Sequence, residues 1–178
     1  ELSNIYTSIS GLNNLKSTII KKYIKLHKKE YKKDEIIITN GARAIIFTYL
    51  LTIKNMAIKQ SKKIVGKVII PYWGQYKHIF EALQIEYDTY QTLEQIQINK
   101  DEINVFCLIN PGNPDGKLYS YEELKYIHDL INLNKNLYVI SDEVYSEIIF
   151  ENKKYLSLAS LLNKDQHKQI ITINSCSK

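Results

Sequence analysis

The chain has 178 residues, of which 44% are hydrophobic and 24% charged, so it has the composition of a folded globular domain rather than a disordered chain. No apolar run approaches the roughly 20 residues that a membrane-spanning helix needs, so we expect a soluble protein with no membrane partner. The formal charge of +5 comes almost wholly from lysine, with Arg43 as the only arginine, which argues against a nucleic-acid partner.

The spacing of apolar residues predicts alternating helices and strands. In chain order we expect a helix over 12–31, a strand over 35–39, a helix over 44–59, a strand over 67–70, a helix over 75–83, strands over 85–90 and 105–109, a helix over 121–133, a strand over 137–140, a short helix over 156–162 and a strand over 169–174. This alternation predicts an α/β fold of three α/β/α layers with a mostly parallel sheet. Chemistry is then expected at the carboxyl ends of the strands.

Two of the segments that follow strands have features that could bind a ligand. Residues 39–44 turn through Gly41 into a helix, whose free N–H groups and positive dipole end would hold an anion such as phosphate. Residues 71–76 place Trp73, the only tryptophan, at a strand end, where its ring could cover a flat cofactor. A plain tight turn and a core tryptophan are the alternative interpretations.

Three further strand ends carry polar side chains. Two prolines and two glycines in 110–116 make a rigid turn that gives the Asn113 amide a defined direction, although simple turn chemistry would need the same residues. Asp142 lies at the mouth of the sheet, where burial is costly without a cationic partner. Lys178 reaches the same rim, unless it is merely an exposed lysine.

These segments, in this order, resemble the fold-type-I pyridoxal-phosphate enzymes, specifically the class I and II aminotransferases. The resemblance runs from about Tyr6 to Lys178. Its most specific parts are Asn-Pro-Gly-Asn-Pro-Asp-Gly at 110–116, Ser-Asp-Glu-Val-Tyr at 141–145 and Ser-Cys-Ser-Lys at 175–178. The resemblance implies that residues 1–178 are the large domain that binds pyridoxal 5'-phosphate, incomplete because the C-terminal small domain is lacking.

The resemblance assigns catalytic roles residue by residue. Lys178 is similar to the Schiff-base lysine, which binds the cofactor aldehyde and later moves a proton between substrate and cofactor. Asp142 matches the carboxylate that pairs with the pyridinium nitrogen. Asn113 and Tyr145 match the two groups that hydrogen-bond the ring hydroxyl oxygen, and Trp73 matches the aromatic side chain that stacks on the ring.

The resemblance also implies how the phosphate is held. The matching groups are Gly41 and the backbone N–H groups of Ala42 and Arg43 at a helix N-terminus, with the Ser175 hydroxyl beside them. Tyr6 resembles the tyrosine that reaches the phosphate of the neighbouring subunit. If so, the active enzyme is a homodimer.

Some residues depart from the family pattern. Asp115 stands where the family usually has threonine, and it adds a negative charge near the site. Lys16 stands where many relatives have arginine. The arginines that bind the phosphate and clamp the substrate carboxylate normally follow the Schiff-base lysine, so we expect them beyond residue 178. Arg43 is in the wrong place to replace them.

The resemblance therefore implies a pyridoxal-phosphate-dependent aminotransferase of amino acid metabolism, which moves an amino group between an L-amino acid and a 2-oxo acid. It does not name the donor or the acceptor. A lyase or synthase on the same scaffold stays open, such as an aminocyclopropane-carboxylate-synthase-like or cysteine-S-conjugate lyase-like enzyme. A ligand-sensing regulator with an upstream DNA-binding domain, or a catalytically inactive remnant, also stays open.

The remaining features give weaker expectations. Two cysteines, Cys107 and Cys176, make neither a disulfide framework nor a metal cluster, so we expect no metal site and a reducing, cytoplasmic location. The chain begins at Glu1 and ends directly after a strand-like stretch, which suggests an internal piece of a longer chain. The four histidines fall away from strand ends, and we expect surface or packing roles for them.

Overall fold

The computed structural model describes residues 6–150, 152–163 and 165–178. Its centre is a five-stranded sheet of order β2-β1-β3-β4-β5 in which all four pairings are parallel, as the sequence predicts. The elements are α1 (Asn13–His27), η1 (Lys33–Glu35), α2 (Ala42–Lys59), β1 (Ile64–Ile69), α3 (Gln75–Ala82), β2 (Glu86–Tyr90), η2 (Leu93–Gln95), β3 (Ile103–Ile109), α4 (Tyr121–Leu133), β4 (Leu137–Asp142), η3 (Leu158–Ser160), η4 (Gln166–Gln169) and β5 (Ile170–Ile173), where η marks a 3₁₀ helix. Among the described helices, none is both long and apolar enough to cross a membrane.

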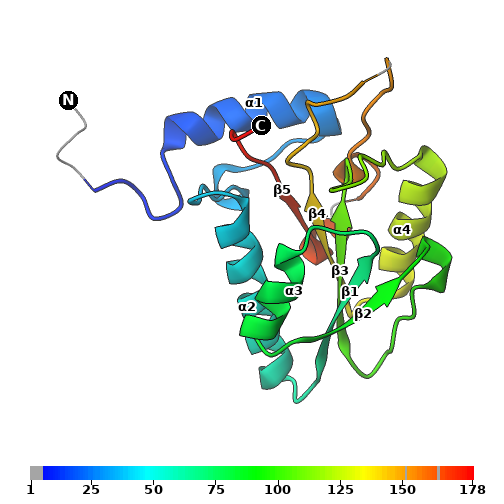
Figure 1. Cartoon of the computed structure of the whole chain (residues 1–178). Coiled ribbons are helices and arrows are strands. Elements are labelled where there is room, and N and C mark those ends of the chain that lie inside the picture. The colour runs from blue at the N-terminus through cyan, green and yellow to red at the C-terminus, as the bar shows by residue number, and fades with distance from the viewer. Residues whose placement is uncertain (1–5, 151, 164) are drawn as a thin grey trace.

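Helices cover both faces of the sheet, which gives the predicted three layers (Figure 1). On one face α2 and α3 pack through a buried cluster that includes Leu50, Val68 and Phe80. On the other face α4, η2 and η3 pack through a second cluster that includes Phe106 and Ile127. The central strand β3 is buried at all seven positions because both of its faces are covered.

The order of the strands changes direction between β1 and β3. From β1 the chain first adds β2 on one side, then crosses over to place β3 on the other side and continues outward through β4 to β5. In an open parallel sheet, the carboxyl ends of the strands on either side of such a switch point diverge and leave a crevice for ligands. The expected binding position is therefore above the ends of β1 and β3.

Helix α1 lies across the carboxyl end of the sheet, near the C-terminus of the chain, rather than flat on either face (Figure 1). The Nε2 of its last residue, His27, lies 4.0 Å from the Oε2 of Glu143, which directly follows β4. On the helix surface, Lys22 forms an ion pair with Glu147. Helix α1 is thus joined to the loop after β4.

Three predicted elements differ from the structure in type or by four or more residues in length, whereas the ends of the others shift by at most three residues. The strand predicted over 35–39 is wrong: η1 ends at Glu35, and the extended residues after it pair with no strand of the described sheet. The helix predicted over 12–31 ends at His27, because Lys28 adopts a left-handed conformation with φ 54°. The helix predicted over 156–162 is only the short turn η3, which the Ser157 hydroxyl caps.

Candidate active site

The segments singled out in the sequence meet at the carboxyl rim of the sheet. Ile109 at the end of β3 is level with Asp142 at the end of β4, and Asp142 is level with Ile173 at the end of β5. The loops that follow these three strands therefore leave the sheet side by side. They carry Asn113, Tyr145 and Lys178 respectively.

Asp142 is a buried carboxylate with one unpaired oxygen. The Tyr76 hydroxyl donates a hydrogen bond of 3.2 Å to Oδ2, whereas Oδ1 is buried and has no partner among the described residues. Burial raises the pKa of Asp142 to about 6, and the nearby Val144 backbone N–H and Tyr76 hydroxyl oppose this rise. An unpaired buried carboxylate oxygen is costly, so Oδ1 is suited to a cationic N–H donor from a ligand.

Aromatic and cationic groups lie next to this carboxylate. Tyr76 is fully buried in the first turn of α3, and its ring meets the Trp73 ring edge-on at a centroid distance of 5.9 Å. The Arg43 guanidinium carbon lies 5.5 Å from the centre of the Trp73 ring. These contacts join the start of α2, the end of β1 and the end of β4 in one continuous group.

A second group joins the loops after β3, β4 and β5. The Asn113 amide donates a hydrogen bond of 3.1 Å to the Tyr145 hydroxyl. The Lys178 Nζ lies 5.6 Å from the centre of the Tyr145 ring. The structure thus brings together three side chains that the sequence assigns to one site.

Helix α2 begins without a side-chain cap. Its N-cap residue, Gly41, has φ 89° and ψ 166°, and a Cβ atom placed on it would meet nothing within 4 Å. The backbone N–H groups of Ala42 and Arg43 therefore open the helix without a capping side chain. Such a helix start can accept an anion.

Two candidate residues are not brought into contact with these groups. The Ser175 hydroxyl lies 2.7 Å from the Ser177 hydroxyl and has no described contact with the start of α2. The Tyr6 side chain is fully exposed. Its expected partner belongs to a neighbouring subunit, so that expectation stays a prediction.

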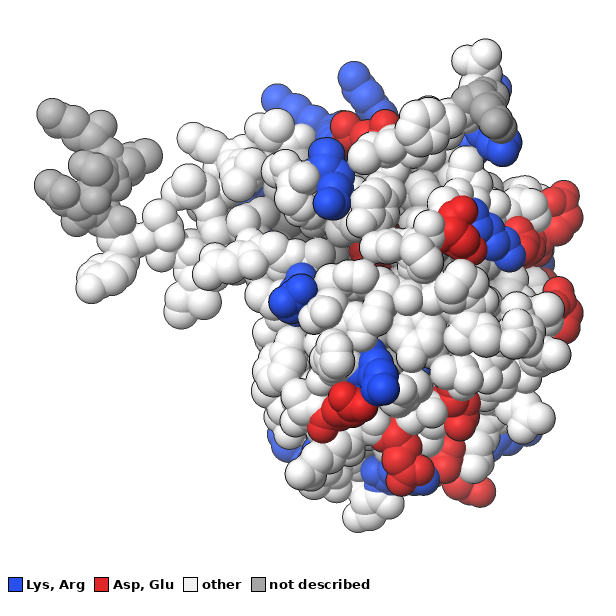
Figure 2. All heavy atoms as spheres, viewed as in Figure 1, with Lys and Arg blue, Asp and Glu red and all other residues white. Residues whose placement is uncertain are grey.

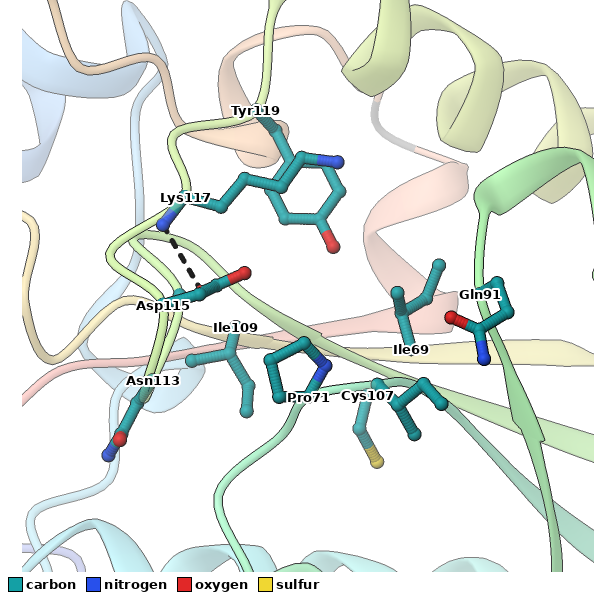
Figure 3. Close-up of a pocket in the computed structure, with 11 residues that line it drawn as sticks. Ile69, Pro71, Gln91, Cys107, Ile109, Asn113, Asp115, Lys117 and Tyr119 are labelled. Carbon is teal, nitrogen blue, oxygen red and sulfur yellow. Dashed lines mark hydrogen bonds between the residues drawn. The ribbon is translucent and has the colours of Figure 1, made fainter.

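A cavity of about 190 Å³ opens at the switch point of the sheet, beside Asn113 (Figure 3). Ile69 and Gln91 lie on one side of it, and the 111–119 loop lies on the other. Asp115 lines it and accepts a hydrogen bond of 3.2 Å from the Lys117 backbone N–H, so the carboxylate that departs from the family pattern has a turn role. The full lining is Ile69, Ile70, Pro71, Gln91, Cys107, Ile109, Gly112, Asn113, Asp115, Lys117 and Tyr119.

Sequence reasoning missed three buried polar residues near the rim. The sequence places Tyr76 in a predicted helix and Glu143 in the 141–145 motif, but it assigns neither of them a role of its own. For His27 it predicts only a packing or surface role. All three are almost completely buried. Their contacts join parts of the chain that are distant in the sequence, so local patterns do not reveal them. The one local signal was Glu143 itself, a second carboxylate directly beside Asp142.

Comparison with known proteins agrees with this fold. The family model described as "Aminotransferase class I and II" matches residues 1–178. An aspartate aminotransferase from Bacillus sp. (strain YM-2) is 30% identical over 97% of this chain and 45% of its own length. Among solved structures, the aspartate aminotransferase from Rhizobium meliloti has a TM-score of 0.82 at 21% identity, covering 98% of this chain and 44% of that one. A PLP-bound structure from Clostridium difficile 630 has a TM-score of 0.74 at 22% identity, covering 96% and 44%. The chain thus spans about half the length of these relatives.

Proposed function

The chain belongs to the class I and II aminotransferase family, and from this premise we propose that it is the cofactor-binding large domain, residues 1–178, of a pyridoxal-phosphate-dependent transaminase. The proposed reaction moves an amino group between an L-amino acid and a 2-oxo acid. The observation that carries the proposal is the buried, unpaired Oδ1 of Asp142, which lies at the sheet rim together with Asn113, Tyr145 and Lys178.

The residues at the rim fit this cofactor. Bound pyridoxal phosphate supplies an electron sink for the negative charge that develops on the substrate Cα. Asp142 would hold a proton on the pyridine nitrogen through Oδ1, while Tyr76 keeps the carboxylate in place through Oδ2. Asn113 and Tyr145, already joined by a hydrogen bond, would bind the ring hydroxyl oxygen, and Trp73 would cover the ring face.

Lys178 has two proposed roles. Its amino group would attach the cofactor aldehyde covalently, and, once released, it would carry a proton to and from the substrate Cα. Its position 5.6 Å from the Tyr145 ring supports these roles because Tyr145 also belongs to the ring-binding group. The uncapped start of α2 at Gly41, with Ala42 and Arg43, would bind the phosphate, together with the Ser175 hydroxyl.

The proposed substrates and location follow from the relatives and the cysteines. Relatives named as aspartate aminotransferases support an acidic amino acid as one substrate. The two cysteines, Cys107 and Cys176, are both free, which is consistent with a reducing compartment such as the cytoplasm.

The proposed assembly is a homodimer. Phe47, Leu51 and Ile58 are exposed along one face of α2, and Leu12 and Leu15 are exposed near the start of α1. The described N-terminal residues 6–12 carry no charged side chain and are drawn white in Figure 2. A second copy that covers this face would also bring its own Tyr6 toward the phosphate position, as expected from the sequence.

Covalent trapping tests the proposal. The chain is incubated with pyridoxal phosphate and reduced with borohydride, and the modified residue is identified by peptide mass spectrometry. We expect one dominant adduct on Lys178, which is lost in Lys178→Ala and kept in Lys168→Ala, a control that removes an exposed lysine. Adducts scattered over many lysines, or none at all, would overturn the proposal.

A further inference from the structure

A second carboxylate follows Asp142 directly and points to a different part of the molecule. Glu143 is completely buried, and its Oε1 accepts hydrogen bonds from the hydroxyls of Ser141 at 2.8 Å and Ser157 at 2.7 Å. Its Oε2 is buried and unpaired. His27, at the end of α1, faces this oxygen: its Nε2 lies 4.0 Å from Oε2 and is also buried and unpaired.

The other nitrogen of the His27 ring has a partner. Nδ1 lies 2.8 Å from the Tyr31 hydroxyl, which can either accept a hydrogen bond from Nδ1–H or donate one to Nδ1. The two arrangements differ in charge. If Nδ1 carries a proton and donates it to Tyr31, one further proton lies between Nε2 and Oε2, and the His27–Glu143 pair is neutral. If Nδ1 accepts from Tyr31, Nε2 carries the ring proton and donates to an ionised Glu143, and the pair has a charge of −1.

We propose that His27 and Glu143 hold one proton between Nε2 and Oε2, with Nδ1 donating to Tyr31, so that this buried pair is neutral and Asp142 alone carries the negative charge at the end of β4. His27 and Glu143 are then positioning residues, which act on the site through Asp142. Only this last consequence rests on the proposed function.

Electrostatics favours the neutral pair. Two adjacent buried carboxylates would repel each other if both were ionised, and each would carry a desolvation cost. The pKa of Glu143 is raised to about 7, chiefly by burial and to a smaller extent by Asp142. The pKa of His27 is lowered to about 4, chiefly by burial and in addition by the charges of Lys29 and His167.

The hydroxyls of Ser141, Ser157 and Tyr155 oppose the rise in the pKa of Glu143, but none of them carries a positive charge that would balance an ionised carboxylate. Burial raises the pKa of Tyr23 and of Tyr31 to about 12, so both are neutral, and burial also raises the pKa of Tyr155, which is near Glu143, far above its usual value. The two groups that lower the pKa of His27 by their charge lie together: the Lys29 Nζ is 3.2 Å from the His167 Nε2. The facing titratable groups are Tyr23 on α1, Lys29 and Tyr31 after α1, Asp142 on β4, Tyr155 before η3 and His167 on η4.

The protonation of Nδ1 distinguishes the two arrangements in the unmodified chain. Nuclear magnetic resonance of the ring nitrogens at about pH 6 is expected to show a protonated Nδ1 on His27. An unprotonated Nδ1 next to a protonated Nε2 would overturn the proposal, because Glu143 would then be ionised. This measurement needs no cofactor, so it can fail independently of the proposed function.

The pH dependence of unfolding provides a second test. In the unfolded chain His27 binds a proton below about pH 6.5 and Glu143 below about pH 4.5, whereas the folded pair keeps its one proton up to about pH 7. Folding therefore exchanges no net proton at this pair between pH 4.5 and 6.5. The pair adds no slope to stability in that range.

Single substitutions should reveal slopes of opposite sign relative to the unmodified chain. In Glu143→Gln only the lowered pKa of His27 remains, so stability should rise with pH from about 4 to 6.5. In His27→Gln only the raised pKa of Glu143 remains, so stability should fall as pH rises from about 4.5 to 7. Glu147→Gln, which removes an exposed carboxylate, is the control for lost charge. An unchanged slope in Glu143→Gln would contradict the shared proton.

Discussion

Around α4 the chain pairs its own polar groups, whereas at the carboxyl rim of the sheet it leaves several of them open. The Ser120 hydroxyl accepts from the Glu123 backbone N–H at 3.2 Å, and the Glu123 carboxylate accepts from the Ser120 N–H at 2.8 Å. Gln169 donates to the carbonyls of Asn134 and Leu137 at 2.8 Å each. At the rim, by contrast, Gly41 begins α2 without a side-chain cap and Asp142 keeps an unpaired oxygen.

The paired groups around α4 stabilise the fold, whereas the unpaired groups at the rim are available to bind a ligand. A capping box and satisfied carbonyls lower the free energy of the folded state directly. An open helix start and an unpaired carboxylate raise it, unless a bound molecule supplies the missing partner. Removal of the unpaired Asp142 carboxylate should therefore weaken ligand binding and raise stability, whereas substitutions around α4 should affect stability alone.

Asp142→Asn should break this contrast most strongly. We expect turnover by the proposed transaminase to fall roughly 10²–10³-fold, because a preorganised charge is lost from the site. The pKa of Asp142 is raised on folding from 3.8 to about 6, so its ionisation costs stability as pH rises through that range. Without cofactor, the variant should therefore be more stable than the unmodified chain at pH 8, by up to about 3 kcal/mol, and little different near pH 4.

Chemical denaturation at the two pH values, together with an assay of transamination, measures both effects. Asp129→Asn removes a half-exposed carboxylate on α4, which is paired with Lys125, and serves as the control. A loss of stability at pH 8 in Asp142→Asn would show that a partner already satisfies this carboxylate in the folded chain.

Gly41→Ala tests the open start of α2. A Cβ atom at Gly41 has free space, so the substitution acts only through the backbone, where φ 89° and ψ 166° disfavour a side chain. We expect a loss of roughly 1–3 kcal/mol in the free energy of unfolding. Gly74→Ala is the matched control, since its Cβ position is equally free and its φ is −57°. Equal losses in both variants would exclude backbone strain at Gly41.

Tyr76→Phe sharpens the account of Asp142. Removal of the hydroxyl leaves Oδ2 without its 3.2 Å hydrogen bond, which should cost about 1 kcal/mol and raise the pKa of Asp142 further. As the pH is lowered, Asp142 should then become protonated, and cofactor binding should weaken, at a higher pH than in the unmodified chain. The absorbance of bound pyridoxal phosphate follows this loss of binding. Tyr138→Phe, whose hydroxyl contacts Met56 instead, should leave this pH unchanged.

Ser120→Ala tests the other side of the comparison and has the smallest expected effect. Loss of the N-cap hydroxyl should lower the free energy of unfolding by about 1 kcal/mol. Cofactor affinity should not change, because α4 lies on the far side of the sheet from α2 and α3 (Figure 1). A clear loss of affinity would mean that the two regions are coupled through the sheet.

Local signals explain which parts of the fold could be predicted. Helix α4 occupies the predicted residues 121–133, because Ser120 and Glu123 mark its start and its apolar period is regular. The predicted strand over 35–39 failed because a strand needs a neighbour, and the sequence does not show which segments pair. The end of α1 was missed because Lys28, not glycine, adopts the left-handed conformation there.

The same distinction applies to the candidate site. Parallel strands end at one rim, so Asn113, Asp142, Tyr145 and Lys178 could be placed together from their position after strands alone. The hydrogen bond from Tyr76 to Asp142 and the approach of α1 to Glu143 depend on how helices pack above the rim. No period or spacing in the sequence predicts those contacts.

The two thiols of the chain differ in a way that has a practical use. Cys107 is buried below the switch-point cavity, whereas Cys176 is exposed two residues before Lys178. A maleimide dye added to the folded chain should therefore label one position, close to the proposed attachment point. Fluorescence from that dye would report occupancy of the rim in real time, without any change to the sequence.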